Sequence, residues 1–392
     1  MTDVVVVGAG PVGTLLAAEL QRRGVDVRVL ERRPTSGHGS RAIGVHAPVL
    51  AALESSGITE RLLEKALRVP RGVARSGDHV LGIVRFDRLS TRFPFVATLP
   101  QAETEAVLAA VSPAPERGRE VTGVRPRAGE VELEVTRQGG PADGAVEQLT
   151  APIVVLAGGW TARSLVYRDG HVPTTTYRDR YLMSDIMVPD RPDADTAVVN
   201  LAPSGVLESF PLPGSLRRVV AWDAAATMLT DEAAADLAAV RVQRLQAALR
   251  ARGEASVADA VETATAFGIR RVCAPQLRRG RLFVIGDAAH EVSPIGGQGM
   301  NLGLLDAVGL APLLARWVRE RTAPDAEIAA WERRRVRSAA RAGQLAAVNT
   351  VLGRPRRGAA DVARRTLVRG MLTPPLGRGF AWAYAMGLDA GP

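Results

Sequence analysis

The sequence predicts a mixed α/β fold in which a doubly wound parallel sheet is interrupted by two strand-rich insertions. Three features of the 392 residues support this prediction. The N-terminus has a strand–helix–strand pattern, buried strands that end in glycine recur at Ile153–Leu156 and Leu282–Ile285, and segments with alternating polarity separate these pieces. Parallel strands joined by helices are typical of α/β proteins, whereas alternating polarity is typical of antiparallel strands with one solvated face.

The N-terminal unit begins with the β-branched run Thr2–Val7, which predicts a buried strand. Pro11 suits the first turn of a helix, where its missing N–H costs nothing, and the helical spacing of apolar residues continues to Arg23. Gly24 is typical of a helix C-cap, and Val25–Leu30 predicts a second strand. We therefore expect a βαβ opening.

The elements that follow alternate between helix and strand. Helices are expected at Ala47–Ser56, Glu60–Leu67, Gln101–Val111, Asp231–Arg252 and Asn301–Glu320. Strands are expected within Val69–Leu99 and at Glu120–Arg127, Val131–Arg137, Tyr181–Val188, Val206–Pro211 and Arg218–Trp222.

Composition excludes several classes of protein. With 46% apolar and 23% charged residues, the chain is globular rather than disordered. The single cysteine, Cys273, excludes a disulfide scaffold and a cysteine-based zinc site, and the five scattered histidines form no ligand pattern, so no metal is expected. Aromatic residues, at 4%, are too sparse for a base-stacking nucleic-acid platform. Neither a transmembrane segment nor a signal peptide is expected, which predicts a cytoplasmic protein.

The net charge of +9 is concentrated near the C-terminus. Twelve arginines and one acid, Asp361, lie between Arg333 and Arg378, whereas the rest of the chain is close to neutral. The ordinary interpretation is that these arginines lie on solvated faces of C-terminal helices. The alternative is a docking surface for an acidic partner, an anionic substrate or a membrane surface.

The first motif that indicates chemistry is G-x-G-x-x-G at Gly8, Gly10 and Gly13, placed between a strand and a helix. Gly8 permits the tight turn, Gly10 allows a pyrophosphate to approach the backbone, and Gly13 allows close helix packing. With Pro11 and Val12 they form the mouth of a helix whose free N–H groups favour an anion. Glu31 ends the next strand, where a carboxylate can bind a ribose. The alternative is a purely structural turn.

The second motif runs from Gly286-Asp287-Ala288-Ala289-His290 to the glycine-rich Pro294–Asn301. These residues resemble the FAD-dependent aromatic hydroxylases related to p-hydroxybenzoate hydroxylase, particularly the bacterial aromatic-polyketide hydroxylases. The resemblance implies that Pro294 lies beside the reactive edge of the flavin and that His290 is mainly structural. It also implies flavin contacts from Asp287, Gly296, Gly297, Gly299, Met300 and Asn301.

Other segments are similar to the same family. The resemblance implies cofactor contacts by Arg32, Arg41 and Gln101, and it brings His46 near the flavin, although a packed histidine is the ordinary interpretation. In the family's third motif an Asp-Gly pair contacts both FAD and NAD(P)H, but this chain has Trp160-Thr161 there. The missing carboxylate leaves reduction by NAD(P)H open.

The resemblance implies a monooxygenase that inserts one oxygen atom from O₂, through a flavin C4a-hydroperoxide, into an aromatic or polyketide-like molecule in natural-product biosynthesis. NAD(P)H is the expected reductant, and no catalytic base is assigned. The substrate pocket is expected against the inserted sheet. Its expected lining residues are Met183, Leu207, Phe210 and Trp222.

The implied fold is a Rossmann-like FAD-binding domain (1–69, 101–172 and 268–330) interleaved with a β-sheet substrate domain (70–100 and 173–267). A C-terminal helical region (331–392) follows, without the thioredoxin-like domain of longer relatives. Two other functions stay open. One is a non-redox, cyclase-like enzyme in which FAD shapes the pocket, and the other is a non-enzymatic protein that binds a partner.

Overall fold

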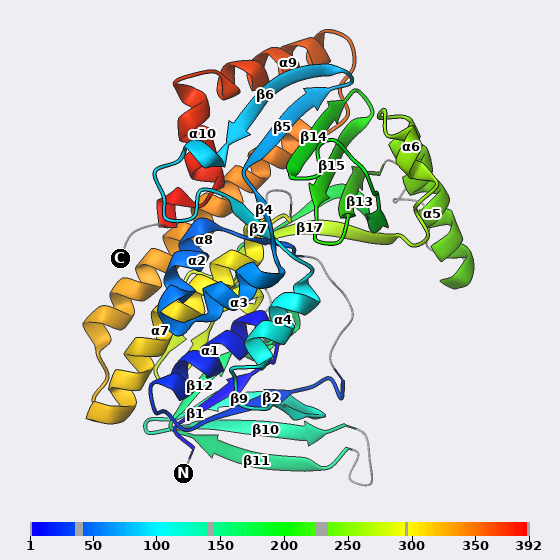
Figure 1. The fold of residues 1–392 in the computed structure, drawn as a ribbon. Coiled ribbons are helices and arrows are strands. Elements are labelled where there is room, and N and C mark those ends of the chain that lie inside the picture. The colour runs from blue at the N-terminus through cyan, green and yellow to red at the C-terminus, as the bar shows by residue number, and fades with distance from the viewer. Residues whose placement is uncertain are drawn as a thin grey trace.

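The computed structural model describes residues 2–35, 42–138, 144–168, 170–223, 234–294 and 297–389. Two large sheets organise the molecule, and long helices run between and beside them (Figure 1). The N-terminus lies beside the sheet that begins the chain.

The sheet that begins the chain, the N-terminal sheet, has the strand order β18-β19-β12-β1-β2-β8. Its strands are β1 (Val4–Val7), β2 (Val27–Glu31), β8 (Glu116–Arg117), β12 (Ile153–Leu156), β18 (Arg278–Arg279) and β19 (Leu282–Val284). All neighbouring pairs are parallel except β18 and β19. The central strands β1 and β12 are fully apolar and buried because helices and a second sheet cover both faces.

Helices α1 (Pro11–Arg22), α4 (Gln101–Ala109) and α7 (Gly299–Glu320) pack on one side of this sheet. An antiparallel meander lies on the other side and shares the same core. Its strands are β9 (Arg119–Pro126), β10 (Val131–Arg137) and β11 (Val146–Ala151). The inward residues Val131, Leu133 and Val135 alternate along β10 and are fully buried, as the period of two requires.

The second sheet, the large sheet, has the order β20-β17-β13-β16-β15-β14-β5-β6. Its strands are β5 (Arg71–Ser76), β6 (His79–Arg85), β13 (Thr174–Met187), β14 (Thr196–Ala202), β15 (Gly205–Pro211), β16 (Leu216–Trp222), β17 (Thr265–Cys273) and β20 (His290–Glu291). Helices α5 (Ala234–Arg250) and α6 (Ala255–Ala258) cover one face. Helix α9 (Ala359–Leu372) packs against the other face.

The remaining elements connect the two sheets. They are α2 (Ala47–Leu53), α3 (Ile58–Lys65), α8 (Asp325–Gly353), α10 (Leu376–Tyr384), the strands β3 (Gly44–Val45), β4 (Leu67–Val69) and β7 (Val96–Thr98), and the 3₁₀ segments η1 (Glu54–Ser56), η2 (Phe86–Arg88), η3 (Trp160–Leu165), η4 (Gly286–Ala288) and η5 (Gly387–Asp389). β3, β7 and β4 form a small antiparallel sheet.

The structure confirms the mixed α/β class, and most predicted elements differ only at their ends. The prediction of one helix over Glu60–Leu67 was wrong at its end, because Leu67 already pairs with Thr98 in the small sheet. Strands β14 and β17 were not predicted. Part of the predicted helix Asp231–Arg252 lies outside the described residues. Helix α7 meets the length and hydropathy of a membrane span, but 61% of its most apolar window is buried, as in a core helix.

Candidate cofactor and substrate site

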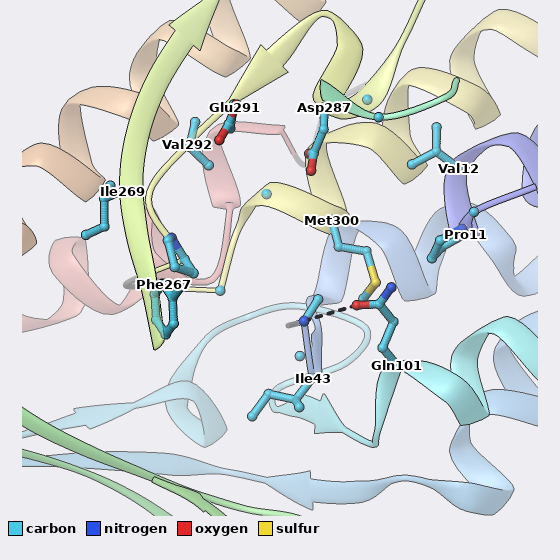
Figure 2. Close-up of a pocket in the computed structure, with 18 of the residues that line it drawn as sticks. Pro11, Val12, Ile43, Gln101, Phe267, Ile269, Asp287, Glu291, Val292 and Met300 are labelled. Carbon is cyan, nitrogen blue, oxygen red and sulfur yellow. Dashed lines mark hydrogen bonds between the residues drawn. The ribbon is translucent and has the colours of Figure 1, made fainter. Parts of the chain in front are cut away.

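A cavity of about 1020 Å³ lies between the two sheets. Figure 2 shows Pro11 and Val12 of α1 on one side and Phe267 and Ile269 of β17 on the other, with Met300 between them. One end of the cavity is thus built from glycine-rich turns of the N-terminal sheet, and the other end from apolar side chains of the large sheet.

The turn after β1 is fixed by contacts that exclude side chains. Gly8 has a φ of +107°, and a Cβ there would lie 2.6 Å from Gly158 Cα. A Cβ on Gly13 would lie 2.0 Å from the Gly8 carbonyl oxygen, so only glycine lets α1 begin this close to the strand. A Cβ on Gly10 would meet no protein atom within 4 Å. Because Gly10 lines the cavity, that open space is where a ligand can contact the backbone.

Glu31 lies at the end of β2 and lines the same end of the cavity. One carboxylate oxygen accepts a hydrogen bond from the Ala9 N–H at 2.7 Å, and the other accepts from the Arg33 backbone N–H at 2.9 Å. Burial alone would raise the pKa of Glu31, but these donors and the Arg33 guanidinium lower it below its ordinary value. Glu31 is therefore an anion that holds the glycine turn in place. Arg32 lines the cavity beside it, with a half-exposed side chain.

The turn after β19 contributes the opposite wall. Asp287 is exposed on the cavity surface, and the 3₁₀ segment η4 carries it. The Arg163 guanidinium donates to the carbonyl oxygens of Asp287 and Ala288, at 2.6 Å and 3.2 Å. Arg163 also forms an ion pair with Glu291 at 3.3 Å. The segment that aligns with the family's third motif therefore supports the turn formed by the second.

The glycine-rich segment continues this wall. Pro294, Gly297, Gly299 and Met300 line the cavity, whereas Gly296 lies outside the described residues. Gly297 has a φ of +67°, which favours glycine.

Asn301 was expected to contact the flavin. In the structure its side chain is fully buried and does not line the cavity. Its amide donates to the Gly44 and Gly297 carbonyl oxygens at 2.8 Å and 3.0 Å. Its oxygen accepts from the His46 N–H at 2.8 Å. Asn301 thus joins the glycine-rich turn to the start of α2.

His46 lies beside Gly297 and lines the cavity, with only 2% of its surface exposed. Burial lowers its pKa to about 4, so the imidazole is neutral at neutral pH. Its Nδ1 has no hydrogen-bond partner among the described residues. The geometry supports a packed, neutral histidine beside the cofactor end.

Two other predicted cofactor residues have different outcomes. Gln101, at the start of α4, lines the cavity, and its side-chain oxygen accepts a hydrogen bond from the Ala42 N–H at 3.3 Å (Figure 2). Arg41 lies outside the described residues.

Trp160 and Thr161 line the cavity where the family's third motif carries Asp-Gly. The indole of Trp160 is 48% exposed, and the Arg270 guanidinium lies 4.7 Å from the ring centroid. Arg270 in turn pairs with Glu291 at 3.2 Å. A cation–π stack therefore occupies this edge of the cavity, where the family places a carboxylate.

At the substrate end, four residues were expected to line the cavity. Met183 and Phe210 do so, but Leu207 and Trp222 do not. Side chains alternate along β15, so Leu207 points to the opposite face, where it is buried in the cluster that contains Leu245 of α5. Trp222 lies on the cavity face beyond the cavity edge, where its indole N–H donates to Asp179 at 3.1 Å.

Glu208 and Tyr384 are two polar groups at this end that sequence reasoning missed. Glu208 is 3% exposed and lines the cavity from β15, and Tyr384 lines it from α10. The period of two was the available signal, since Val206, Glu208 and Phe210 share one face of the strand.

The residues present fit FAD. Two glycine turns line one elongated cavity, and the open space at Gly10 is a cradle that a Cβ would enter. The described residues contain no group of three or more His, Cys, Asp or Glu that could hold a metal ion. A helix N-terminus after the first strand, a carboxylate ending the second, and a second turn on the same cavity together define a dinucleotide-binding protein.

The chain belongs to the family described as "FAD binding domain", which matches residues 1–346. It is 34% identical over 330 residues to 6-methylpretetramide 4-monooxygenase of Streptomyces rimosus, an alignment that covers 81% of this chain and 56% of that protein. Across five such curated relatives, the alignments cover between 56% and 64% of the relative's length.

Solved structures agree on the fold. CabE, an aromatic hydroxylase from angucycline biosynthesis, superposes with a TM-score of 0.78 at 27% identity, over all of this chain and 77% of that chain. The p-nitrophenol 4-monooxygenase PnpA from Pseudomonas putida DLL-E4 gives a TM-score of 0.85 at 23% identity, over all of this chain and 98% of that chain. The second likeness is one of fold alone.

Proposed function

We propose that this protein is an FAD-dependent monooxygenase that inserts one oxygen atom from O₂ into an aromatic or polyketide-like molecule in natural-product biosynthesis. The observation that carries this proposal is the continuous cavity, which joins two glycine turns suited to a dinucleotide to an apolar compartment suited to a planar substrate. The activities in the names of the relatives support it, since 6-methylpretetramide 4-monooxygenase and CabE both act as oxygenating enzymes by name.

Named residues would hold each part of the cofactor. The N–H groups at the start of α1 would bind the pyrophosphate beside Gly10, and Glu31 and Arg32 would face the adenosine end. Asp287 and Gln101 would contact the cofactor from opposite walls. Pro294, Gly297, Gly299 and Met300 would line the flavin ring, with Arg41 and Gly296 as further expected contacts.

Bound FAD would supply the activation of O₂, which protein side chains do not provide. The protein orients the substrate with apolar side chains of the large sheet, among them Met183 and Phe267, and excludes water from the compartment. Helices α9 and α10 close the compartment with Leu372 and Phe380.

NAD(P)H is the reductant we propose, and the decisive experiment is anaerobic flavin reduction. Purified FAD-loaded protein is mixed with NADH or NADPH, with and without hydroxylated polycyclic aromatics, and flavin absorbance is followed. Reduction that the aromatic compound accelerates, together with transfer of ¹⁸O from ¹⁸O₂ to product, supports the proposal. A flavin that dithionite reduces but NAD(P)H does not reduce contradicts the choice of reductant.

A non-redox, cyclase-like enzyme is the second candidate, because Trp160-Thr161 replace the Asp-Gly pair of the family and Arg270 stacks on the Trp160 ring. Turnover of a substrate that continues without O₂ and without reductant supports this candidate. Strict dependence on both contradicts it.

We also propose that the protein is cytoplasmic, with the FAD-binding, substrate-binding and helical regions divided at the boundaries expected from the sequence.

The arginine-rich region offers one surface for an acidic partner. Arg333, Arg334, Arg337 and Arg341 are exposed on α8, and none forms an ion pair within the described part of the chain. Salt-sensitive binding to polyglutamate, lost when the four are replaced by glutamine, tests this surface.

A further inference from the structure

The large sheet carries one carboxyl group on an otherwise uncharged row of its cavity face. The backbone pairing aligns Ala74 of β5, Val199 of β14, Glu208 of β15, Val220 of β16 and Met183 of β13 side by side. All five residues line the cavity. Glu208 therefore projects from the middle of an apolar wall, where a carboxyl group contributes nothing to packing that valine or leucine would not supply.

No group in the part of the chain that the structure describes neutralises this carboxyl. Within the described residues Glu208 accepts no hydrogen bond and forms no ion pair, although it is 3% exposed. Arg218 lines the cavity from the same face as Glu208, and Asp185 engages its guanidinium through two bonds of 2.7 Å. Burial raises the pKa of Glu208 to about 8. A buried polar group without a protein partner indicates a ligand that supplies one.

Besides the Arg218–Asp185 pair and the Arg270–Glu291 pair, which also lines the cavity, the titratable groups on this side are two phenols and one ion pair outside the lining. Tyr384 faces it from α10, and burial together with the Glu208 charge raises the pKa of Tyr384 above its ordinary value. Tyr181 of β13 is stacked on Phe267, with ring centroids 5.6 Å apart, and its pKa is raised in the same way. Asp179 pairs with Arg354 at 2.9 Å, outside the cavity lining.

We propose that Glu208 binds a hydroxyl group on the aromatic ring of the substrate and accepts its proton. This inference rests on the proposed function and names its substrate class as hydroxylated aromatics. In the step, the substrate O–H bond breaks, an O–H bond forms on the Glu208 carboxylate, and the electron pair stays on the substrate oxygen. The ring becomes more electron-rich, and the proton is later released to solvent.

The position in the apolar wall makes this transfer accessible. An ordinary phenol has a pKa of about 10, so an exposed glutamate near pKa 4.3 would be opposed by a factor of more than about 10⁵. A carboxylate with a pKa near 8 is opposed by a factor of only about 10². The pKa of Glu208 is thus closer to the pKa of the phenol that it would deprotonate. Such a match between base and acid favours general-base catalysis.

The test compares two probes on the FAD-loaded protein, 2-naphthol and 2-methoxynaphthalene, in which a methyl group replaces the hydroxyl hydrogen. Affinities are measured by fluorescence titration from pH 6.5 to 9.5. The wild type is expected to prefer the naphthol by about tenfold above pH 8, where the carboxylate accepts a charge-assisted hydrogen bond, and by less below that pH.

Glu208→Gln keeps the shape of the side chain but loses the ionisation, so the preference is expected to become independent of pH. The exposed Glu60→Gln on α3 is the matched control and should behave as wild type. Thermal melting and flavin content of both variants confirm that they fold. Where a substrate is turned over, kcat in the wild type should rise with pH through about 8, and the glutamine variant should lack this rise.

Equal affinities for the two probes, or the same pH-dependent preference in Glu208→Gln, would overturn the inference. A Glu208-dependent preference for 2-naphthylmethylamine over 2-naphthol would also overturn it, by assigning the carboxylate to a cationic substrate. Because these readouts need no turnover, a protein that fails to transfer oxygen can still show them. Failure of the proposed function and failure of this inference are therefore distinguishable.

Discussion

At the scale of single residues, Asp306 holds the turn at Gly286 in place. It is fully buried on α7 and accepts a hydrogen bond from the Gly286 N–H at 3.0 Å and from the Arg335 guanidinium at 2.7 Å. His290 Nε2 lies 2.6 Å from the same carboxylate. His290 thus anchors the motif that begins at Gly286. Arg335, an arginine of the C-terminal region, lies inside the protein as part of this network and does not face solvent.

Asp306→Asn is expected to destabilise the protein by about 3–5 kcal/mol at neutral pH, because Arg335 is left buried without its counter-charge. Burial alone would raise the pKa of Asp306, but His290 and Arg335 lower it. The stabilisation is therefore complete above the ordinary aspartate pKa and is lost as pH falls through the lower, folded-state value.

Urea unfolding at neutral and acidic pH measures this effect. The control is Asp259→Asn, since Asp259 is 84% exposed and its ion pair with Arg250 contributes little. A stability of Asp306→Asn equal to that of the control would show that the buried network is not needed for folding.

Gly10→Val tests the cofactor cradle. The new side chain would contact no protein atom near its Cβ, so the flavin-free chain should keep its thermal stability. FAD affinity should fall by at least about tenfold, because the side chain occupies the space beside the α1 N–H groups. Flavin fluorescence titration gives the affinity, and Gly129→Val, at an exposed glycine with equally open surroundings, should leave it unchanged. Equal affinity in Gly10→Val and wild type would place the phosphate elsewhere.

At the scale of the element, the two faces of strand β15 have different roles. One face packs in the core and the other lines the cavity. Leu207 packs against α5, so Leu207→Ala should cost about 2–5 kcal/mol of stability and leave ligand affinity unchanged. Phe210 lines the cavity, so Phe210→Ala should weaken binding of 2-naphthol with a smaller loss of stability. Urea unfolding and fluorescence titration on both variants check the pair, and the reverse pattern would contradict the assignment of faces.

The same strand shows what sequence reasoning can and cannot predict. The glycine motifs and the buried strands before them were predictable, because turn geometry and helix N-termini impose local rules on glycine and on β-branched runs. Alternation along β15 already required Leu207 and Phe210 to lie on opposite faces. Which of the two faces the cavity was not predictable, because it depends on how the large sheet packs against its neighbours. The role of Asn301 also depended on contacts to Gly44 and His46, more than 250 residues away in the chain.

At the scale of the whole molecule, the cavity belongs to both sheets at once. Residues of β1, β2 and α1 line one end and residues of β13–β17 line the other, so neither sheet forms the site alone. Arginines of the C-terminal region fasten this arrangement, since Arg354 pairs with Asp179 of β13 and Arg364 donates to the Leu201 and Ala202 carbonyl oxygens of β14. The basic region is therefore partly structural.

A cofactor that spans both sheets should stabilise the molecule as a unit. At free FAD about 100 times its dissociation constant, mass action adds about 2.7 kcal/mol to the free energy of unfolding. With an unfolding entropy of about 2.1 cal/mol/K per residue over the chain, this raises the melting temperature by about 3 °C. Differential scanning calorimetry of wild type should show one transition that moves as a whole. At the same FAD concentration Gly10→Val, with an affinity at least about tenfold lower, should show at most about half of that shift. A scan in which FAD moves only one of two separate transitions would mean that the cofactor binds the N-terminal sheet without engaging the large sheet, and the substrate compartment would then be independent of the flavin.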